Sequence, residues 1–307
     1  MLSWLNWIGH HSRWVLALGC VAALFMEDFG ALVRPALGPL IALLLALAMM
    51  RVNLPRVMQE TLSPRHLPRN LLISVAVLVI TPVIVWLLAT SVDLSNEAVA
   101  ALVFFCCAPP IASSASLCFI LKLDGALALR VTLLASLFAP LTGPLVATQL
   151  LGTNIEVPTL ELILRITLIM MGGLVGALIL RRIWSPSTIE ANATAFDGVS
   201  TLAMLMFLFP LFKGVATGIQ ERPLLALGIL ALVVVANFGL RIIVTLMSRR
   251  LGRKGSGTSG LMWGNRSVAI YLAVLPESLF FNLFVALYQF PMYFTPLVLK
   301  RFYNRDG

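Results

Sequence analysis

The chain has 307 residues, of which 60% are hydrophobic and only 11% are charged, whereas about a quarter of the residues in soluble domains are charged. So few charged side chains cannot cover the surface of a soluble protein, and the composition excludes one. The net charge of +9 does not indicate nucleic-acid binding, because the basic residues are grouped between apolar runs, as in membrane proteins.

Ten apolar stretches follow one another along the chain. A hydrocarbon core of about 30 Å needs about 20 residues of helix, and most of the stretches reach that length. We therefore predict membrane-spanning helices over residues 14–26, 32–50, 67–92, 98–121, 126–151, 160–180, 196–219, 224–247, 260–275 and 279–298.

The charged residues between these stretches predict the orientation. Basic groups follow the second, sixth, eighth and tenth stretches, whereas acidic residues such as Asp93 and Glu277 follow the third, fifth and ninth. Positive charge stays on the cytoplasmic side. We therefore expect an integral, multi-pass protein of a bacterial inner (plasma) membrane with both termini in the cytoplasm. The basic groups are Arg51, Arg56, Arg65 and Arg69; Arg181 and Arg182; Arg249, Arg250, Arg253 and Lys254; and Lys300, Arg301 and Arg305.

Two predicted helices at corresponding positions are interrupted. Pro109 and Pro110 break the fourth stretch, and Gly260 and Gly264 loosen the start of the ninth. Interruptions that match between two halves indicate a transporter site, although prolines can also simply kink a membrane helix. We predict an all-α membrane protein of about ten transmembrane helices in two inverted five-helix repeats, residues 1–153 and 154–307, which form one integrated domain.

Four segments carry a resemblance to a known family. They are Ala108 to Ser116, Lys122 to Thr132, Leu137 to Pro144, and Gly260 to Ala269, which reads Gly-Leu-Met-Trp-Gly-Asn-Arg-Ser-Val-Ala. They resemble the Ser-Asn, Gly-Asp/Asn and Ala/Ser-Pro-Leu-x-x-Pro patterns, and the Glu-x-Gly-x-Gln-Asn pattern, of the bile acid:sodium symporter family. The resemblance implies panel and core domains, with discontinuous helices four and nine crossing near the middle of the bilayer, where substrate and sodium bind.

The sodium ligands of that family are mostly missing. Sodium prefers oxygen ligands, and the resemblance places six of them in helices four, five and nine. Only Ser114 and Thr132 keep their oxygens, as residual metal-site positions. We expect no sodium coupling through this site and no other cofactor. The four replaced positions are Ala115, Ala128, Gly260 and Gly264.

Arg266 is the charged residue predicted to lie at the crossing. A charge at that depth is costly unless it is paired or lines a wet cavity. Its acceptors could be the carboxylate of an incoming substrate or the free carbonyls of the unwound segments, in which case it is structural. The predicted substrate-binding residues are Asn265, Arg266, Ala112, Ser113, Ser114 and Ser267.

Other polar residues receive structural interpretations. Asp124 is predicted to cap the fifth helix after a tight turn. Lys122 and Arg130 lie near the cytoplasmic surface, and we expect both to snorkel. Cys106 and Cys107 come before the two prolines, whereas arsenite transporters have their cysteine directly after the proline. We therefore do not expect arsenite transport.

These observations predict a transporter of a small organic carboxylate, secondary active or facilitative, that works by alternating access. The alternative is a transport-incompetent membrane sensor or binding module. No catalytic constellation is evident, so we do not expect an enzyme. The expected partners are the small organic anion and the lipid bilayer, with no nucleic acid and no obligate protein partner.

Overall fold

The computed structural model describes residues 2–152 and 157–303, and in these two ranges the chain forms helices joined by turns and short extended segments. Six helical stretches are long and apolar enough to cross a membrane, and a pair bent by 83° near the N-terminus would make a seventh. The chain is therefore an all-helical integral membrane protein. The six stretches are Glu27–Met49, Leu67–Ser91, Gly125–Leu151, Thr159–Ile183, Ala193–Leu211 and Pro223–Met247.

Two of the remaining predicted spans are broken, whereas the tenth lies in one continuous helix, α19 (Leu279–Tyr303). The fourth is divided into α8 (Asn96–Cys107) and α9 (Ser114–Ile120), and the ninth into α17 (Gly252–Gly264) and α18 (Ala269–Leu272). The interruption after α8 is therefore confirmed. The ninth stretch is also broken, but Gly260 and Gly264 lie within α17 and the break follows Gly264. The ten-helix inverted repeat remains a prediction, and its boundary at residues 153 and 154 lies outside the described residues.

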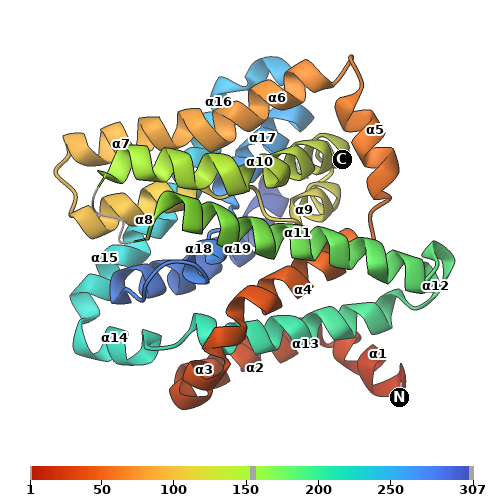
Figure 1. Ribbon diagram of the computed structural model, residues 1–307, viewed down its shortest axis with the longest axis horizontal. Coiled ribbons are helices and arrows are strands. Elements are labelled where there is room, and N and C mark those ends of the chain that lie inside the picture. Colours follow the sequence, from red (N-terminus) through yellow and green to blue (C-terminus); the bar gives the residue numbers. More distant parts are fainter. Residues whose placement is uncertain (1, 153–156, 304–307) are drawn as a thin grey trace.

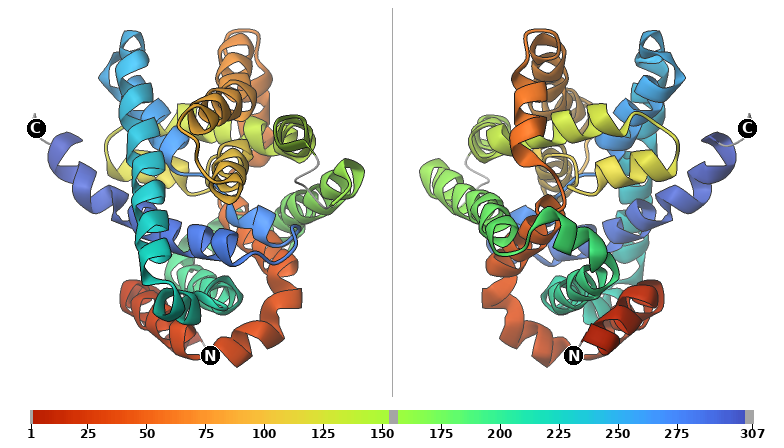
Figure 2. Two further views of the ribbon diagram at one scale, coloured as in Figure 1. Left: turned by 90° about the vertical axis from the view of Figure 1, so that its left-hand side faces the viewer. Right: turned by 90° about the vertical axis from the view of Figure 1, so that its right-hand side faces the viewer.

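One layer of the molecule is built around α13 (Ala193–Leu211), which packs against four N-terminal helices, one of which also packs against α11 (Thr159–Ile183). We call it the lower layer, as it lies at the bottom of Figures 1 and 2. A Cβ added at Gly198 would lie 2.2 Å from the carbonyl oxygen of Leu5, so the missing side chain permits the close approach. The four helices are α1 (Leu2–His10), α2 (Ser12–Phe25), α3 (Glu27–Val33) and α4 (Leu37–Met49).

The upper layer contains the two broken helices and the helices that enclose them (Figure 2). Two of its long stretches contain a π-helical segment: η2 (Ala76–Ile80) and η4 (Val235–Gly239). Such segments are rare and often lie at functional sites. The enclosing helices are α6 (Leu67–Val75) and α7 (Thr81–Ser91) on either side of η2, α15 (Pro223–Val234) and α16 (Leu240–Met247) on either side of η4, and α10 (Gly125–Leu151) and α19 (Leu279–Tyr303).

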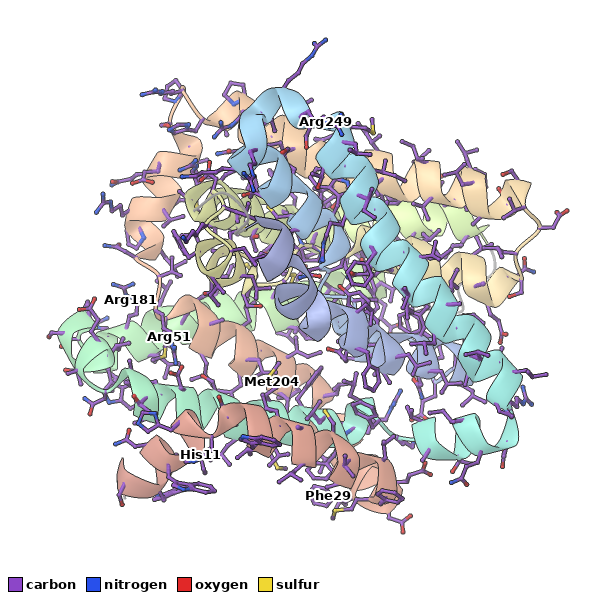
Figure 3. All side chains as sticks on the ribbon, turned by 180° about the vertical axis from the view of Figure 1, so that it is seen from behind. His11, Phe29, Arg51, Arg181, Met204 and Arg249 are labelled. Carbon is purple, nitrogen blue, oxygen red and sulfur yellow. The ribbon has the colours of Figure 1, made fainter. Side chains whose placement is uncertain are left out.

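The loops at the two ends of the bundle differ in charge. Arg51 and Arg181 lie at the same end (Figure 3), close to α5 (Leu54–Leu62) and α12 (Pro186–Ala191); we call it the basic end. The opposite end, with α14 (Val215–Glu221) and the loop after α7, lies at the left of Figure 1. We call it the acidic end, since its loops carry residues such as Asp93 and Glu277.

The start of α10 is held by Asp124. Its carboxylate accepts a hydrogen bond from the Leu127 amide at 2.9 Å, which confirms the predicted cap. Its own amide donates to the Thr258 hydroxyl at 2.9 Å, so the same turn is attached to α17. The cap therefore stabilises both α10 and the contact between the two broken regions.

Replacing Asp124 with alanine should lower stability by about 1 kcal/mol, the usual cost of losing an N-cap acceptor. Asp124→Asn is the matched control, because its amide oxygen can still accept the hydrogen bond. Thermal unfolding in detergent should give a lower midpoint for the alanine variant alone. Equal midpoints for the wild type and Asp124→Ala would contradict the assignment of the cap.

Candidate functional site

The site lies where the two interrupted helices meet. After α8 the chain is extended through Pro109 and Pro110, and after α17 it is extended through Arg266. The two segments pair antiparallel: the Ile111 amide donates to Asn265 O at 3.1 Å, and the Ser267 amide donates to Pro109 O at 2.8 Å. We call this pairing the crossover. It satisfies some of the backbone groups that broken helices leave unpaired, which is costly in an apolar medium.

The guanidinium of Arg266 is enclosed by backbone carbonyls. The residue is 1% exposed. Its Nε donates to Trp263 O at 3.0 Å, and its Nη1 donates to Ala108 O at 3.0 Å, Val77 O at 3.3 Å and Cys106 O at 3.4 Å. Three of these acceptors belong to the C-terminal ends of α8 and α17, where the helix dipole favours a cation.

Two aromatic residues close the crossover around Arg266. The Tyr288 hydroxyl accepts from the Arg266 amide at 2.6 Å and donates to Gly264 O at 2.9 Å. The Trp263 ring lies 5.9 Å from the guanidinium carbon, and its Nε1 donates to the Thr81 hydroxyl at 2.7 Å. These contacts connect α19, α17 and α7, so the position of Arg266 depends on helices far apart in the sequence.

A second buried arginine lies on the other side of Asn265. Arg241 is 2% exposed, and its Nη2 donates to Asn265 Oδ1 at 2.9 Å. Asn237, one turn earlier in η4, donates through Nδ2 to Gly264 O at 2.5 Å and to Asn265 Oδ1 at 3.2 Å. The two π-helical segments thus contact the crossover from two directions: η2 through the carbonyl of Val77 and η4 through Asn237.

The predicted substrate-binding residues lie in two places. Asn265 and Arg266 lie at the crossover, fully buried, and Ser267 is partly buried beside them. Ala112 and Ser113 form the turn before α9, partly buried and exposed respectively.

The two residual metal-site positions are both buried. Ser114 is the first residue of α9 and Thr132 lies on α10. Neither hydroxyl has a hydrogen-bond partner among the described residues. Their assignment as a metal site therefore stays a prediction.

Helix α16 fills the space beside Gly260 and Gly264 of α17. A Cβ at Gly260 would lie 2.0 Å from Thr245 Oγ1, and one at Gly264 would lie 2.7 Å from Asn237 O and 3.2 Å from Arg241 Nη2. A backbone carbonyl cannot turn away as a flexible side chain can. Any larger residue at position 264 would therefore require η4 to move.

The sequence interpretation missed Arg241 and Asn237. The sequence did indicate them, because these two polar residues are four positions apart on one face of an apolar stretch. A charged residue within a membrane span usually has a function. The interpretation of Arg130 was also wrong. The residue does not snorkel but is 8% exposed, with Nη1 3.9 Å from a carboxylate oxygen of Glu60 on α5, whereas Lys122 is exposed as expected.

Comparison with known proteins places the chain in a family. The sequence model of the sodium bile acid symporter family matches residues 39–222, which is more than half of the chain. The match includes the break between α8 and α9 and ends before α17. A search of curated proteins found no match.

Replacing Arg266 with alanine should destabilise the protein even without a ligand. The change leaves carbonyls at the crossover without a donor, and an unsatisfied buried polar group costs roughly 1 to 3 kcal/mol. Thermal unfolding should show a clearly lower midpoint for Arg266→Ala. Arg250→Ala, at an exposed arginine of η5 (Arg249–Leu251), is the control and should unfold like the wild type. An unchanged midpoint for Arg266→Ala would show that the carbonyl contacts do not support the crossover.

Proposed function

The chain belongs to the sodium bile acid symporter family, whose members are transporters and not enzymes, and on that premise we propose that it carries a small organic carboxylate across the membrane by alternating access. The observation that carries the substrate class is the pair of buried arginines, Arg241 and Arg266, on either side of Asn265. Guanidinium groups bind carboxylates with strong, directional hydrogen bonds.

The two arginines have different roles in this proposal. Arg266 already contacts four carbonyls, and its role is to hold the crossover together. Arg241 and Asn265 then provide the donors that recognise the substrate, with the backbone around Ala112, Ser113, Ser114 and Ser267 shaping the pocket in the open states.

The proposed mechanism does not use sodium. Arg266 places a permanent cation against the carbonyls of the broken helices, and α16 occupies the space beside Gly260 and Gly264, where the resemblance expects acidic and amide ligands. Of the oxygen ligands, only those of Ser114 and Thr132 remain. A buried cation without its carboxylate is poorly compensated, which argues against a bound sodium ion.

The proposed architecture has ten spans in two inverted repeats, residues 1–153 and 154–307, arranged as panel and core domains. Support comes from the corresponding third and eighth stretches, Leu67–Ser91 and Pro223–Met247, which both contain a π-helical segment. The fourth and ninth are both broken. In this arrangement the acidic end faces outward from a bacterial inner membrane, and both termini are cytoplasmic.

Purified protein in proteoliposomes should exchange labelled carboxylates in the absence of sodium. Acetate, pyruvate, succinate and citrate would be tested as choline and as sodium salts, with empty liposomes as the control. Equal rates in the two salts are expected, because the fixed arginines replace the ion. Strict dependence on sodium would contradict the proposal. Saturable binding without exchange would favour the alternative, a membrane sensor that no longer transports.

Replacing Arg241 should affect substrate binding more than stability. Arg241→Gln removes the charge but keeps a donor near Asn265, so we expect at least about a tenfold increase in KM, corresponding to the loss of one charge-assisted hydrogen bond. Arg241→Lys should retain part of the affinity. An unchanged KM for Arg241→Gln, in protein that unfolds at the wild-type temperature, would remove Arg241 from the substrate site.

A further inference from the structure

A second group of charged residues lies at the acidic end, between the two layers. Arg34, in η1 (Arg34–Ala36), and Lys213, between α13 and α14, belong to the lower layer, whereas Glu277 lies between α18 and α19 of the upper layer. Arg34 Nε is 2.9 Å from Glu277 Oε1. Lys213 Nζ is 2.9 Å from Oε1 and 3.0 Å from Oε2. Two cations of one layer thus hold one carboxylate of the other.

The two cations form a recognition site for a carboxylate, and Glu277 occupies it. The Arg34 side chain is 12% exposed and is positioned by Asn282, whose Oδ1 lies 3.5 Å from Nη2. Its Nη1 is buried and has no hydrogen-bond partner among the described residues, so the site has a donor to spare. Glu277 itself is 54% exposed and lies on a loop, so it can leave without disturbing a helix.

A proton is not a suitable signal to release Glu277. The hydrogen bond from Lys213, together with the charges of Arg34 and Lys213, lowers the pKa of the Glu277 carboxyl, so the carboxylate stays ionised at neutral pH. A further charged side chain near this region, Arg165, binds Glu161 and the carbonyl of Val274. Another anion is the simplest agent that can compete for the two cations.

We propose that Arg34 and Lys213 form an outer receiving site for the carboxylate of the transported anion, and that Glu277 fills this site while the two layers are closed at the acidic end. The inference rests on the proposed function and adds a site to it. An arriving carboxylate displaces Glu277 and neutralises the two cations, so the layers can separate without leaving them unpaired. An ion pair that is partly open to solvent, as the 54% exposure of Glu277 makes this one, is weak enough to be exchanged in this way.

Opposite effects of two variants test the proposal. Isothermal titration calorimetry in detergent would give Kd values for acetate, pyruvate, succinate and citrate. Glu277→Gln removes the internal competitor and should lower the Kd of the best ligand severalfold. The double variant Arg34→Gln with Lys213→Gln should raise that Kd at least about tenfold, through the loss of charge-assisted hydrogen bonds. Glu221→Gln, at an exposed carboxylate of α14, is the control and should leave the Kd unchanged.

The outcomes separate this inference from the proposed transport. If both charge variants shift the Kd in the same direction, or neither shifts it, the cluster only joins the layers and the inference is overturned. Absence of binding of all four carboxylates to both the wild type and Glu277→Gln also overturns it. Opposite shifts without exchange in proteoliposomes would support the receiving site and contradict transport. Arg34→Lys with Lys213→Arg should keep the wild-type Kd, which guards against misfolding as the cause.

Discussion

The structure depends on how carbonyl groups are satisfied where two helices break inside an apolar medium. A continuous membrane helix bonds its own backbone, but α8 and α17 both end within the molecule, and their last carbonyls need donors. One guanidinium supplies donors to three of them, at Trp263, Ala108 and Cys106, and also to the carbonyl of Val77 in η2. The same group places a positive charge at the negative ends of two helix dipoles. The neighbouring contacts of Tyr288, Asn237 and Arg241 then fix the crossover relative to α19, η4 and α16.

The packing around the crossover follows from this arrangement. Because Gly260 and Gly264 lack side chains, α16 approaches α17 closely enough for Arg241 to reach Asn265. The two π-helical segments bring Val77 and Asn237 to the same place from separate helices. In the proposed function, substrate recognition and helix packing use the same few residues, because Arg241 and Asn265 also hold the crossover. The acidic end is held differently, by partly exposed ion pairs around Glu277.

Much of the fold could be predicted from local chemistry. The hydropathy pattern, the break at Pro109 and Pro110, and the Asp124 cap all depend on neighbouring residues, which the sequence displays directly. The depth of Arg266 was also predictable, and the carbonyls of the unwound segments were one of its two predicted kinds of acceptor. The carbonyl of Val77 was not predictable, because only the folded chain brings η2 to the crossover. The π-helical segments leave no clear pattern in the sequence. Arg130 was misjudged because α5, which follows a polar linker, folds back and carries Glu60 to it. The fourth and ninth predicted spans are broken and the helices nearest the N-terminus are bent, so the number of spans stays a prediction.

The covalent attachment of Arg266 to the chain has an energetic consequence. A bound sodium ion crosses with the substrate and couples transport to an ion gradient. In the mechanism proposed above, the guanidinium stays attached to the protein and couples transport to no ion gradient. A carrier that moves a monoanion in this way follows the electrical potential alone, which is worth about 2.3 kcal/mol per elementary charge at 100 mV. With the cell interior negative, that potential favours a distribution of roughly fifty to one toward the outside. Such a protein would release organic anions from the cell and would not accumulate them, unless it exchanges one anion for another.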